Sequence, residues 1–272
     1  MDLFDSHCHL DFDVFDSDLS DVLHRAHSVG VQSIVIPGVS EQQWQTLDTF
    51  LTKNASESVG LHGACGLHPY FIRDEHSTDE IKARFFTRLK EYSQKPWVVA
   101  IGECGIDASL TDNDGLSIAL QQYYFEQHII IANTAKKPLI VHHRKSHHHI
   151  MQSFKRVRPE FGGVIHAFSG SEQDAQAYID WGFKLGCGGT ITYERAQKTR
   201  RVFRQIKLND IILETDAPDM PLAGYQGQRN EPAQLWSVAK CLAEIRGESI
   251  GRVVEQTTSS ARSLFFNDIS IR

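Results

Sequence analysis

Side chains that bind metal ions follow short apolar runs of the chain. The first run leads into His7-Cys8-His9. Because side chains alternate along a strand, His7 and His9 point to the same face. Two imidazoles side by side can hold a divalent cation. The pair alone is modest evidence, since two incidental polar histidines would have the same spacing.

Four later apolar runs end in the same kind of residue, within Ile-Gly-Glu103, Leu-Ile-Val-His142, Val-Ile-His166 and Leu-Glu-Thr-Asp216. Burying such groups without a metal or another partner would be costly, so coincidence explains them poorly. The set fits two divalent ions that share one carboxylate, and Glu103 is the natural bridge. We therefore predict six metal ligands: His7, His9, Glu103, His142, His166 and Asp216.

Hydrolysis is the chemistry that such a pair of ions supports. Two cations hold a water molecule, lower its pKa so that hydroxide is available near neutral pH, and neutralise charge on phosphoryl oxygens. Asp216 can bind one ion through one oxygen and accept the proton of the water with the other, so we predict it as the general base, with Glu103 as the second catalytic carboxylate. In the alternative, the hydroxide is already formed on the metal and Asp216 only orients it. The histidines suit Zn, Mn, Ni or Co and the carboxylates also admit Mg, which leaves the identity of the two ions open.

Eight β-rich apolar runs alternate with amphipathic stretches. The runs are Leu3–His7, Ser33–Pro37, His62–Gly66, Trp97–Gly102, Pro138–His142, Gly163–His166, Phe183–Cys187 and Ile211–Thr215. Such near-continuous apolar character is typical of parallel strands buried on both faces. Helical spacing predicts helices from Leu19 to Val29, from Leu116 to Lys137 and from Glu231 to Arg246.

The alternation of strands and helices predicts an α/β protein folded as a single (β/α)8 TIM barrel. We find no linker rich in Pro, Gly or Ser, so residues 1–272 are predicted to form one domain. A doubly wound open sheet is the alternative, but it would carry a glycine-rich phosphate loop after the first strand, where His7-Cys8-His9 stands. In a barrel, the C-terminal ends of the strands meet at one mouth, where active sites of this fold lie.

Composition limits the classes of partner. The net charge of −6 and the sequence pI near 6.1 argue against coating of nucleic acid by bulk electrostatics, so work on nucleic acid must depend on a local site. The N-terminus lacks the features of a signal peptide, and no apolar run is as long as a membrane span. Five scattered cysteines without a CxxC pair indicate reduced thiols. We expect a cytoplasmic monomer with no membrane partner.

The longest motifs, in chain order, are DSHCHLDF, GLHP, AIGECGID, PLIVHHR, VIHAFSG, LGCGGTIT, ETDAPDMP and RNEP. They span roughly residues 1–266 and resemble those of the TatD family of metal-dependent deoxyribonucleases. The resemblance implies an amidohydrolase-type TIM barrel in which two divalent metals hydrolyse phosphodiesters, often as an exonuclease on DNA. By motif position it implies metal ligation by the six residues named above. It also suggests that His68, Arg144 and Arg229 face substrate phosphate.

The chain departs from the family pattern in three places. His143 stands where a small Ser or Cys is expected, and Ala108-Ser109-Leu110 replaces aromatic and basic residues. The C-terminal string SSARSLFF has Ser where Asn often stands. These departures indicate a less-characterised subgroup and affect the substrate more than the metals. Asp107 remains open between a turn that bonds its own backbone and a role in the site.

The leading functional prediction is a phosphodiesterase or exodeoxyribonuclease acting on DNA ends or short nucleotide substrates. The alternative is an amidohydrolase or esterase on a small molecule, because the same barrel and metals could serve either chemistry. Such sites commonly carry a carboxylated bridging lysine, where this chain has Glu103, and Arg144 and Arg229 suit a phosphate better than a neutral amide. A binding barrel without turnover would be expected to have a damaged ligand set, and none of the six residues is missing.

Overall fold

Eight parallel strands pair in sequence order from β1 to β8 in the computed structural model, which describes residues 1–54, 58–110 and 116–266. The strands are β1 (Leu3–Asp5), β2 (Val31–Pro37), β3 (Gly60–Cys65), β4 (Val98–Asp107), β5 (Leu139–Arg144), β6 (Gly163–Ile165), β7 (Phe183–Cys187) and β8 (Ile211–Leu213). A backbone hydrogen bond of 2.9 Å from Ser6 N to Leu213 O joins the two ends of the sheet. The predicted TIM barrel is therefore confirmed.

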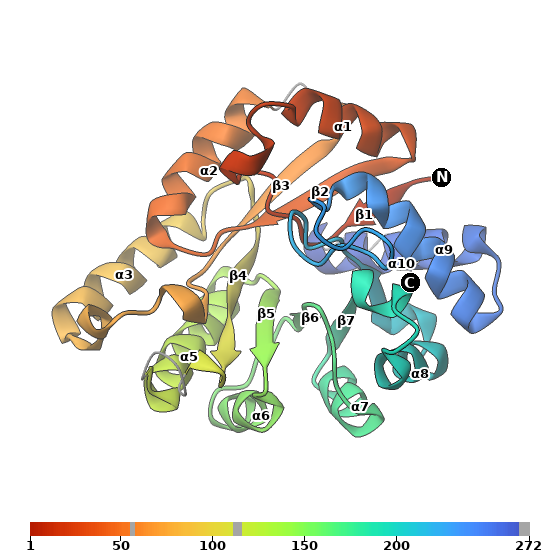
Figure 1. Ribbon diagram of the computed structural model, residues 1–272. Coiled ribbons are helices and arrows are strands. Elements are labelled where there is room, and N and C mark those ends of the chain that lie inside the picture. The colour runs from red at the N-terminus through yellow and green to blue at the C-terminus, as the bar shows by residue number, and fades with distance from the viewer. Residues whose placement is uncertain (55–57, 111–115, 267–272) are drawn as a thin grey trace.

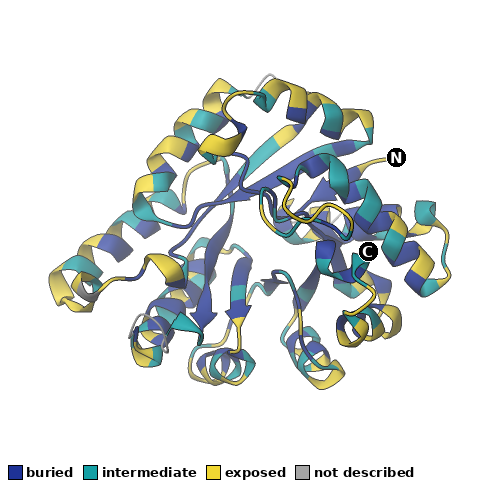
Figure 2. Ribbon diagram, in the orientation of Figure 1, coloured by how far each residue is buried: buried dark blue, intermediate teal, exposed yellow. Residues whose placement is uncertain are grey.

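Helices surround the ring of strands (Figure 1). They are α1 (Leu19–Ser28), α2 (Glu41–Lys53), α3 (Asp79–Tyr92), α5 (Ile118–Ala135), α6 (His147–Arg156), α7 (Glu172–Asp180), α8 (Gln197–Gln205), α9 (Leu235–Arg246) and α10 (Ile250–Phe266). Figure 2 shows buried strands and helices that are exposed only on their outer sides, as expected of a parallel barrel. None of the described helices is long and apolar enough to cross a membrane.

The strand boundaries differ from the sequence prediction in a way that bears on the site. β1 ends at Asp5, so His7 and His9 lie in the loop after it. β4 does not end at Gly102 but continues to Asp107, because Cys104 to Asp107 pair with Val141 to Arg144 of β5. Glu103 therefore lies inside a strand, at the irregularity of the β4–β5 pairing between Ile101 and Cys104, and its N–H donates to Gly38 O over 3.0 Å.

The N-terminal end of the barrel is filled by apolar side chains. Seven strands each contribute one residue to this layer: Phe4, Val35, Ala64, Ala100, Ile140, Val164 and Ile212. Ala261 and Phe265 of α10 pack against them, and the Phe265 ring stacks on Phe4 at a centroid distance of 5.7 Å. Because α10 closes this end, the polar residues farther along the strands face the opposite, C-terminal end.

Candidate metal centre

The six predicted ligands lie together at the C-terminal end of the barrel. Glu103 and His142 extend from β4 and β5, and the other four come from the loops that follow β1, β6 and β8. All six side chains are buried or nearly so; Asp216 and His142 keep 14% and 18% exposure, the largest values of the set. Closure of the sheet brings these strand ends together, although the residues span more than two hundred positions of the chain.

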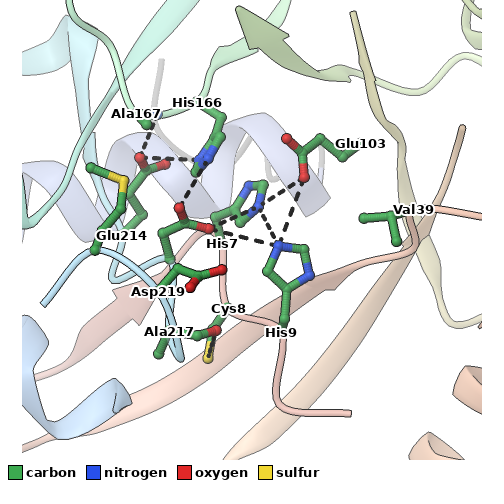
Figure 3. Close-up of polar contacts among 12 residues, drawn as sticks. His7, Cys8, His9, Val39, Glu103, His166, Ala167, Glu214, Ala217 and Asp219 are labelled. Atoms are coloured by element: carbon green, nitrogen blue, oxygen red, sulfur yellow. Dashed lines mark hydrogen bonds and ion pairs between the residues drawn. The ribbon is translucent and has the colours of Figure 1, made fainter. Parts of the chain in front are cut away.

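The first donor group consists of His7, His9, Asp216 and one oxygen of Glu103 (Figure 3). His7 Nε2 lies 3.2 Å from His9 Nε2, 3.3 Å from Glu103 Oε2 and 3.6 Å from Asp216 Oδ1. His9 Nε2 lies 3.8 Å from Glu103 Oε2 and 3.7 Å from Asp216 Oδ1. Tetrahedral coordination with bonds of about 2.0–2.2 Å separates neighbouring donors by about 3.3–3.6 Å, which is close to these spacings.

A second donor group forms around the other oxygen of the same carboxylate. Glu103 Oε1 lies 3.1 Å from His142 Nδ1 and 3.5 Å from His68 Nε2. These three residues form a potential ion-binding group of their own. The two oxygens of Glu103 thus face different sets of imidazoles, which is the arrangement that a bridging carboxylate requires.

His166 lies on the flank of the first group. Its ring stacks on His7 with centroids 3.5 Å apart, and its Nε2 is 3.6 Å from Asp216 Oδ2. Its Nδ1 is 3.2 Å from Glu214 Oε1, and Ala167 N donates to that same oxygen over 2.6 Å. Glu214 therefore orients the His166 ring, as carboxylates commonly do behind metal-binding histidines. A Cβ on Gly186 would lie 2.3 Å from Glu214 Oε2, so only glycine leaves room for this carboxylate.

The charges of the site favour a bound cation. Burial alone would raise the pKa of Glu103, but the imidazoles of His68, His7 and His142 hold it well below its ordinary value. Burial and the neighbouring His166 lower the pKa of His7. Within the described residues, every ion-pair partner of Glu103 and Asp216 is an imidazole, with no Lys or Arg among them. Although burial lowers it, nearby carboxylates raise the pKa of His142 and of His166. Divalent cations bound to these nitrogen and oxygen atoms would balance the two carboxylates in place of protons, so the residues fit the predicted metals.

Hydrogen bonds to the buried carboxylate of Asp5 fix the backbone next to the candidate ligands. The fully buried Asp5 accepts hydrogen bonds from Thr215 N, Thr215 Oγ1 and His7 N, so it ties the end of β1 to the segment after β8. Burial raises the pKa of Asp5 to about 7. Asp216 and Ala167 adopt left-handed conformations, with φ of 56° and 45°. Left-handed non-glycine residues are costly and collect at functional sites.

His142 and His143 face opposite ways, as strand alternation predicts. The His143 ring lies 4.6 Å from that of His147 and 5.9 Å from that of Phe168, outside the barrel interior. Asp107 combines the two roles that its sequence position left open. Its Oδ1 accepts from Ser109 N over 2.9 Å in a local turn, and its Oδ2 lies 3.5 Å from His142 Nε2.

The three predicted substrate contacts occupy different surroundings. His68 belongs to the second donor group, and Pro69 after it begins a short 3-10 turn. Arg144 is exposed at the end of β5. The guanidinium of Arg229 donates to both carboxylate oxygens of Asp18, over 2.8 and 2.7 Å, and to Val14 O over 2.7 Å. Contact of these residues with phosphate remains a prediction.

His68 is the one residue of these donor groups that the sequence analysis did not name as a possible metal ligand. A signal was present, because His68 follows the third apolar run at its C-terminal end, where the other ligands also stand. Two arginines of α8 contact α9: Arg204 donates to Ile245 O over 3.0 Å, and Arg200 donates to Cys241 Sγ over 3.8 Å. Those two cations pack α8 against α9.

Comparisons with known proteins agree with this geometry. The family model described as TatD related DNase matches residues 4–266. A relative from Escherichia coli K12, "uncharacterized metal-dependent hydrolase YjjV", is 36% identical over 261 residues and covers 96% of each chain. An uncharacterized metal-dependent hydrolase from Haemophilus influenzae is 33% identical, over 97% of this chain and 100% of its own.

Solved structures show the same fold. The crystal structure of YJJV, described as a TatD homolog from Escherichia coli, aligns with a TM-score of 0.85 and 34% identity, over 97% of this chain and 98% of that one. The phosphotriesterase homology protein from Escherichia coli has a TM-score of 0.68 but only 12% identity, which shows a shared barrel alone. The match over nearly the whole chain is decisive: this protein belongs to the TatD family of metal-dependent hydrolases.

Proposed function

We propose that the protein is a two-metal phosphodiesterase that releases nucleotides from DNA ends. The observation that carries the proposal is the position of Glu103, whose two oxygens face two donor groups. His7, His9 and Asp216 would hold one ion, with His166 on the flank of this group, and His142 and His68 would hold the other. Bound divalent cations would lower the pKa of a water molecule and neutralise charge on the phosphoryl oxygens.

Asp216 is better placed than Glu103 to accept a proton. Imidazole nitrogens approach the two oxygens of Glu103 to 3.1 and 3.3 Å but those of Asp216 only to 3.6 Å. The side chain of Glu103 is only 4% exposed, whereas that of Asp216 is 14% exposed. Burial would raise the pKa of Asp216, but His166 and His7 lower it below its ordinary value, so the group is ionised at neutral pH. An ionised carboxylate that water can reach is suited to general-base catalysis.

The proposed substrate follows from charge. A phosphodiester in the site would gain most from two cations as negative charge develops in the transition state. Arg144, exposed at the end of β5, supports the placement of a phosphate there. The net charge of −6 disfavours long duplex DNA on the rest of the surface and supports action on ends and short strands.

A compartment can be proposed from the thiols. All five cysteines are free, and Cys8, Cys65, Cys104 and Cys187 are buried. Burial raises the pKa of each of these four thiols, which therefore act as small packing groups and not as nucleophiles. Free cysteines support a reducing compartment, and we propose the cytoplasm.

The test uses purified protein with added Mg or Mn and short single-stranded DNA labelled at one end. Progressive release of mononucleotides, stopped by EDTA and absent in Asp216→Asn, is expected. Parallel assays contain RNA, duplex DNA, model phosphodiesters, amides and carboxylic esters. Robust hydrolysis of an amide or carboxylic ester, with no nucleotide released under any metal, would overturn the proposal and favour an amidohydrolase or esterase.

A further inference from the structure

A cleft of about 880 Å³ opens beside the candidate metal centre, between the loops that follow β1, β2, β3 and β8. We call it the acidic cleft; the residues used here are Asp11, Phe12, Asp13, Phe71, Asp219 and Arg229. Its volume lies within the range of about 300–1,000 Å³ that small-molecule sites occupy. The donor groups described above do not line it, so its role is separate from metal binding.

The acidic cleft is continuous with the metal centre. The ring of Phe12, which lines the cleft, stacks on the ring of His9 at 4.7 Å and an interplanar angle of 19°. A substrate whose scissile bond lies at the metals would therefore extend into this cleft with the adjoining part of its structure.

The charge of the cleft excludes a second phosphate. Its wall carries the carboxyl groups of Asp11, Asp13 and Asp219, and its one cation among the described lining residues is Arg229. Since Asp18 already binds both ends of that guanidinium, the positive charge is compensated. Like charges would repel a phosphodiester strand that continued through the cleft. The adjoining part of the substrate must therefore be uncharged.

The wall offers a surface for a flat ring. Phe71 is 36% exposed, and Tyr70 meets it edge-on at 5.3 Å, which leaves the ring available to a ligand. Stacking of a nucleobase on an aromatic side chain strengthens binding by roughly 5- to 100-fold and works with every base.

The wall also offers hydrogen-bond acceptors. One oxygen of Asp11 accepts from Gln43 Nε2 over 2.6 Å, and the other is buried without a partner among the described residues. Carboxylates accept hydrogen bonds from exocyclic amino groups such as N4 of cytosine. Adenine and guanine also carry an amino group, whereas thymine has none.

We infer that the acidic cleft binds the terminal nucleoside of the substrate, with its base against Phe71 and its amino group toward Asp11. The inference rests on the proposed phosphodiesterase function and deepens it. An uncharged chain end enters the cleft while the rest of the strand leaves the site on another side. Terminal adenine, cytosine and guanine are preferred to thymine, and an extra phosphate on that end is rejected.

The first experiment measures binding of free deoxyadenosine and thymidine by saturation-transfer NMR, with no hydrolysis required. Deoxyadenosine should bind more tightly than thymidine, and Phe71→Ala should weaken deoxyadenosine binding by about 5-fold or more. Asp11→Asn should reduce the preference for deoxyadenosine. The matched control is Ile130→Ala, since Ile130 is 40% exposed on α5 and does not line the cleft; it should leave binding unchanged. Equal binding by wild type and Phe71→Ala would overturn the inference.

The second experiment compares hydrolysis of short DNA that ends in a normal nucleotide or in an abasic one, at each end in turn. At one end, the wild type should release the normal nucleotide at least about 5-fold faster, and Phe71→Ala should abolish this ratio. A phosphate added to that end should slow release. Nucleotide release without any such ratio would overturn the subsite and leave the proposed function intact. Nucleoside binding without release from any DNA would instead count against the proposed function.

Discussion

The two ends of the barrel are built from the same strands but hold opposite kinds of side chain. At the N-terminal end, Phe4, Ala100 and Ile140 pack with Phe265 of α10 in an apolar layer. A few residues farther along, the same strands lead into His7, Glu103 and His142. One end removes apolar surface from water, and the other buries groups that water would solvate well.

The N-terminal end should therefore determine stability, and the C-terminal end should determine function. The apolar layer needs no partner beyond the chain itself, whereas the polar end collects two carboxylates, several imidazoles and the left-handed residues Asp216 and Ala167. A substitution at the N-terminal end should therefore change the free energy of unfolding, and one at the C-terminal end should change metal content and activity.

The largest effect is expected from removing both imidazoles that follow β1. His7→Ala combined with His9→Ala should lose bound metal and at least about 10³-fold in kcat/KM, while the barrel stays folded. Elemental analysis, activity assays and circular dichroism measure the three properties. Full metal occupancy in the double variant would show that the site lies elsewhere.

The corresponding variant at the N-terminal end of the barrel removes an apolar side chain. Phe265→Ala should reduce the free energy of unfolding by about 3–5 kcal/mol, because it leaves a cavity beside Phe4. Metal content and activity per folded molecule should not change. Urea titration measures the stability, with Phe266→Ala as control, since Phe266 is 38% exposed and should have a smaller effect. Loss of metal in Phe265→Ala would show that the N-terminal end also determines metal binding, which contradicts the proposed separation of stability and function.

His128, whose two ring nitrogens have partners within the protein, should make the free energy of unfolding depend on pH. The fully buried His128 of α5 accepts from Leu67 N at Nε2, over 3.0 Å, and its Nδ1 lies 2.6 Å from Tyr124 O. Burial lowers its pKa to about 4. In the unfolded chain the pKa of His128 is near 6.5, so as the pH falls the unfolded chain takes up a proton at this imidazole at a higher pH than the folded protein does. The stabilising contribution is present above about pH 6.5 and is lost as the pH falls toward 4, by roughly 3 kcal/mol.

This pH dependence can be separated from that of other histidines by difference. Urea titrations of wild type and His128→Gln between pH 4 and 7 should show a shallower loss of stability in the variant. Identical slopes in the two proteins would mean that His128 is already protonated in the fold.

The smallest effect is expected at His143. His142→Ala should lose the second metal, because His142 Nδ1 approaches Glu103 Oε1, whereas His143→Ala should keep both metals and change substrate affinity at most. Metal analysis of the two variants side by side tests the strand register. A His143→Ala protein with an empty site would place the register one residue off.

Much of the architecture could be predicted from local patterns. The eight apolar runs all correspond to strands, because a buried parallel strand needs apolar side chains on both faces. The six candidate ligands could be named because each follows or ends such a run, and parallel strands of a barrel converge at their C-terminal ends. Boundaries were less certain: β4 extends to Asp107 since pairing with β5, and not local preference, holds its last residues.

Only the tertiary structure decided how these groups pair. Local patterns do not show that Glu103 turns one oxygen to His7 and the other to His142, or that His68 joins the second group. Nor do they show that Asp18 binds Arg229, a residue 211 positions away. Periodicity acts over a few residues, so it determines which face a side chain occupies. Which partner it meets depends on closure of the barrel, which brings distant strand ends within hydrogen-bond distance.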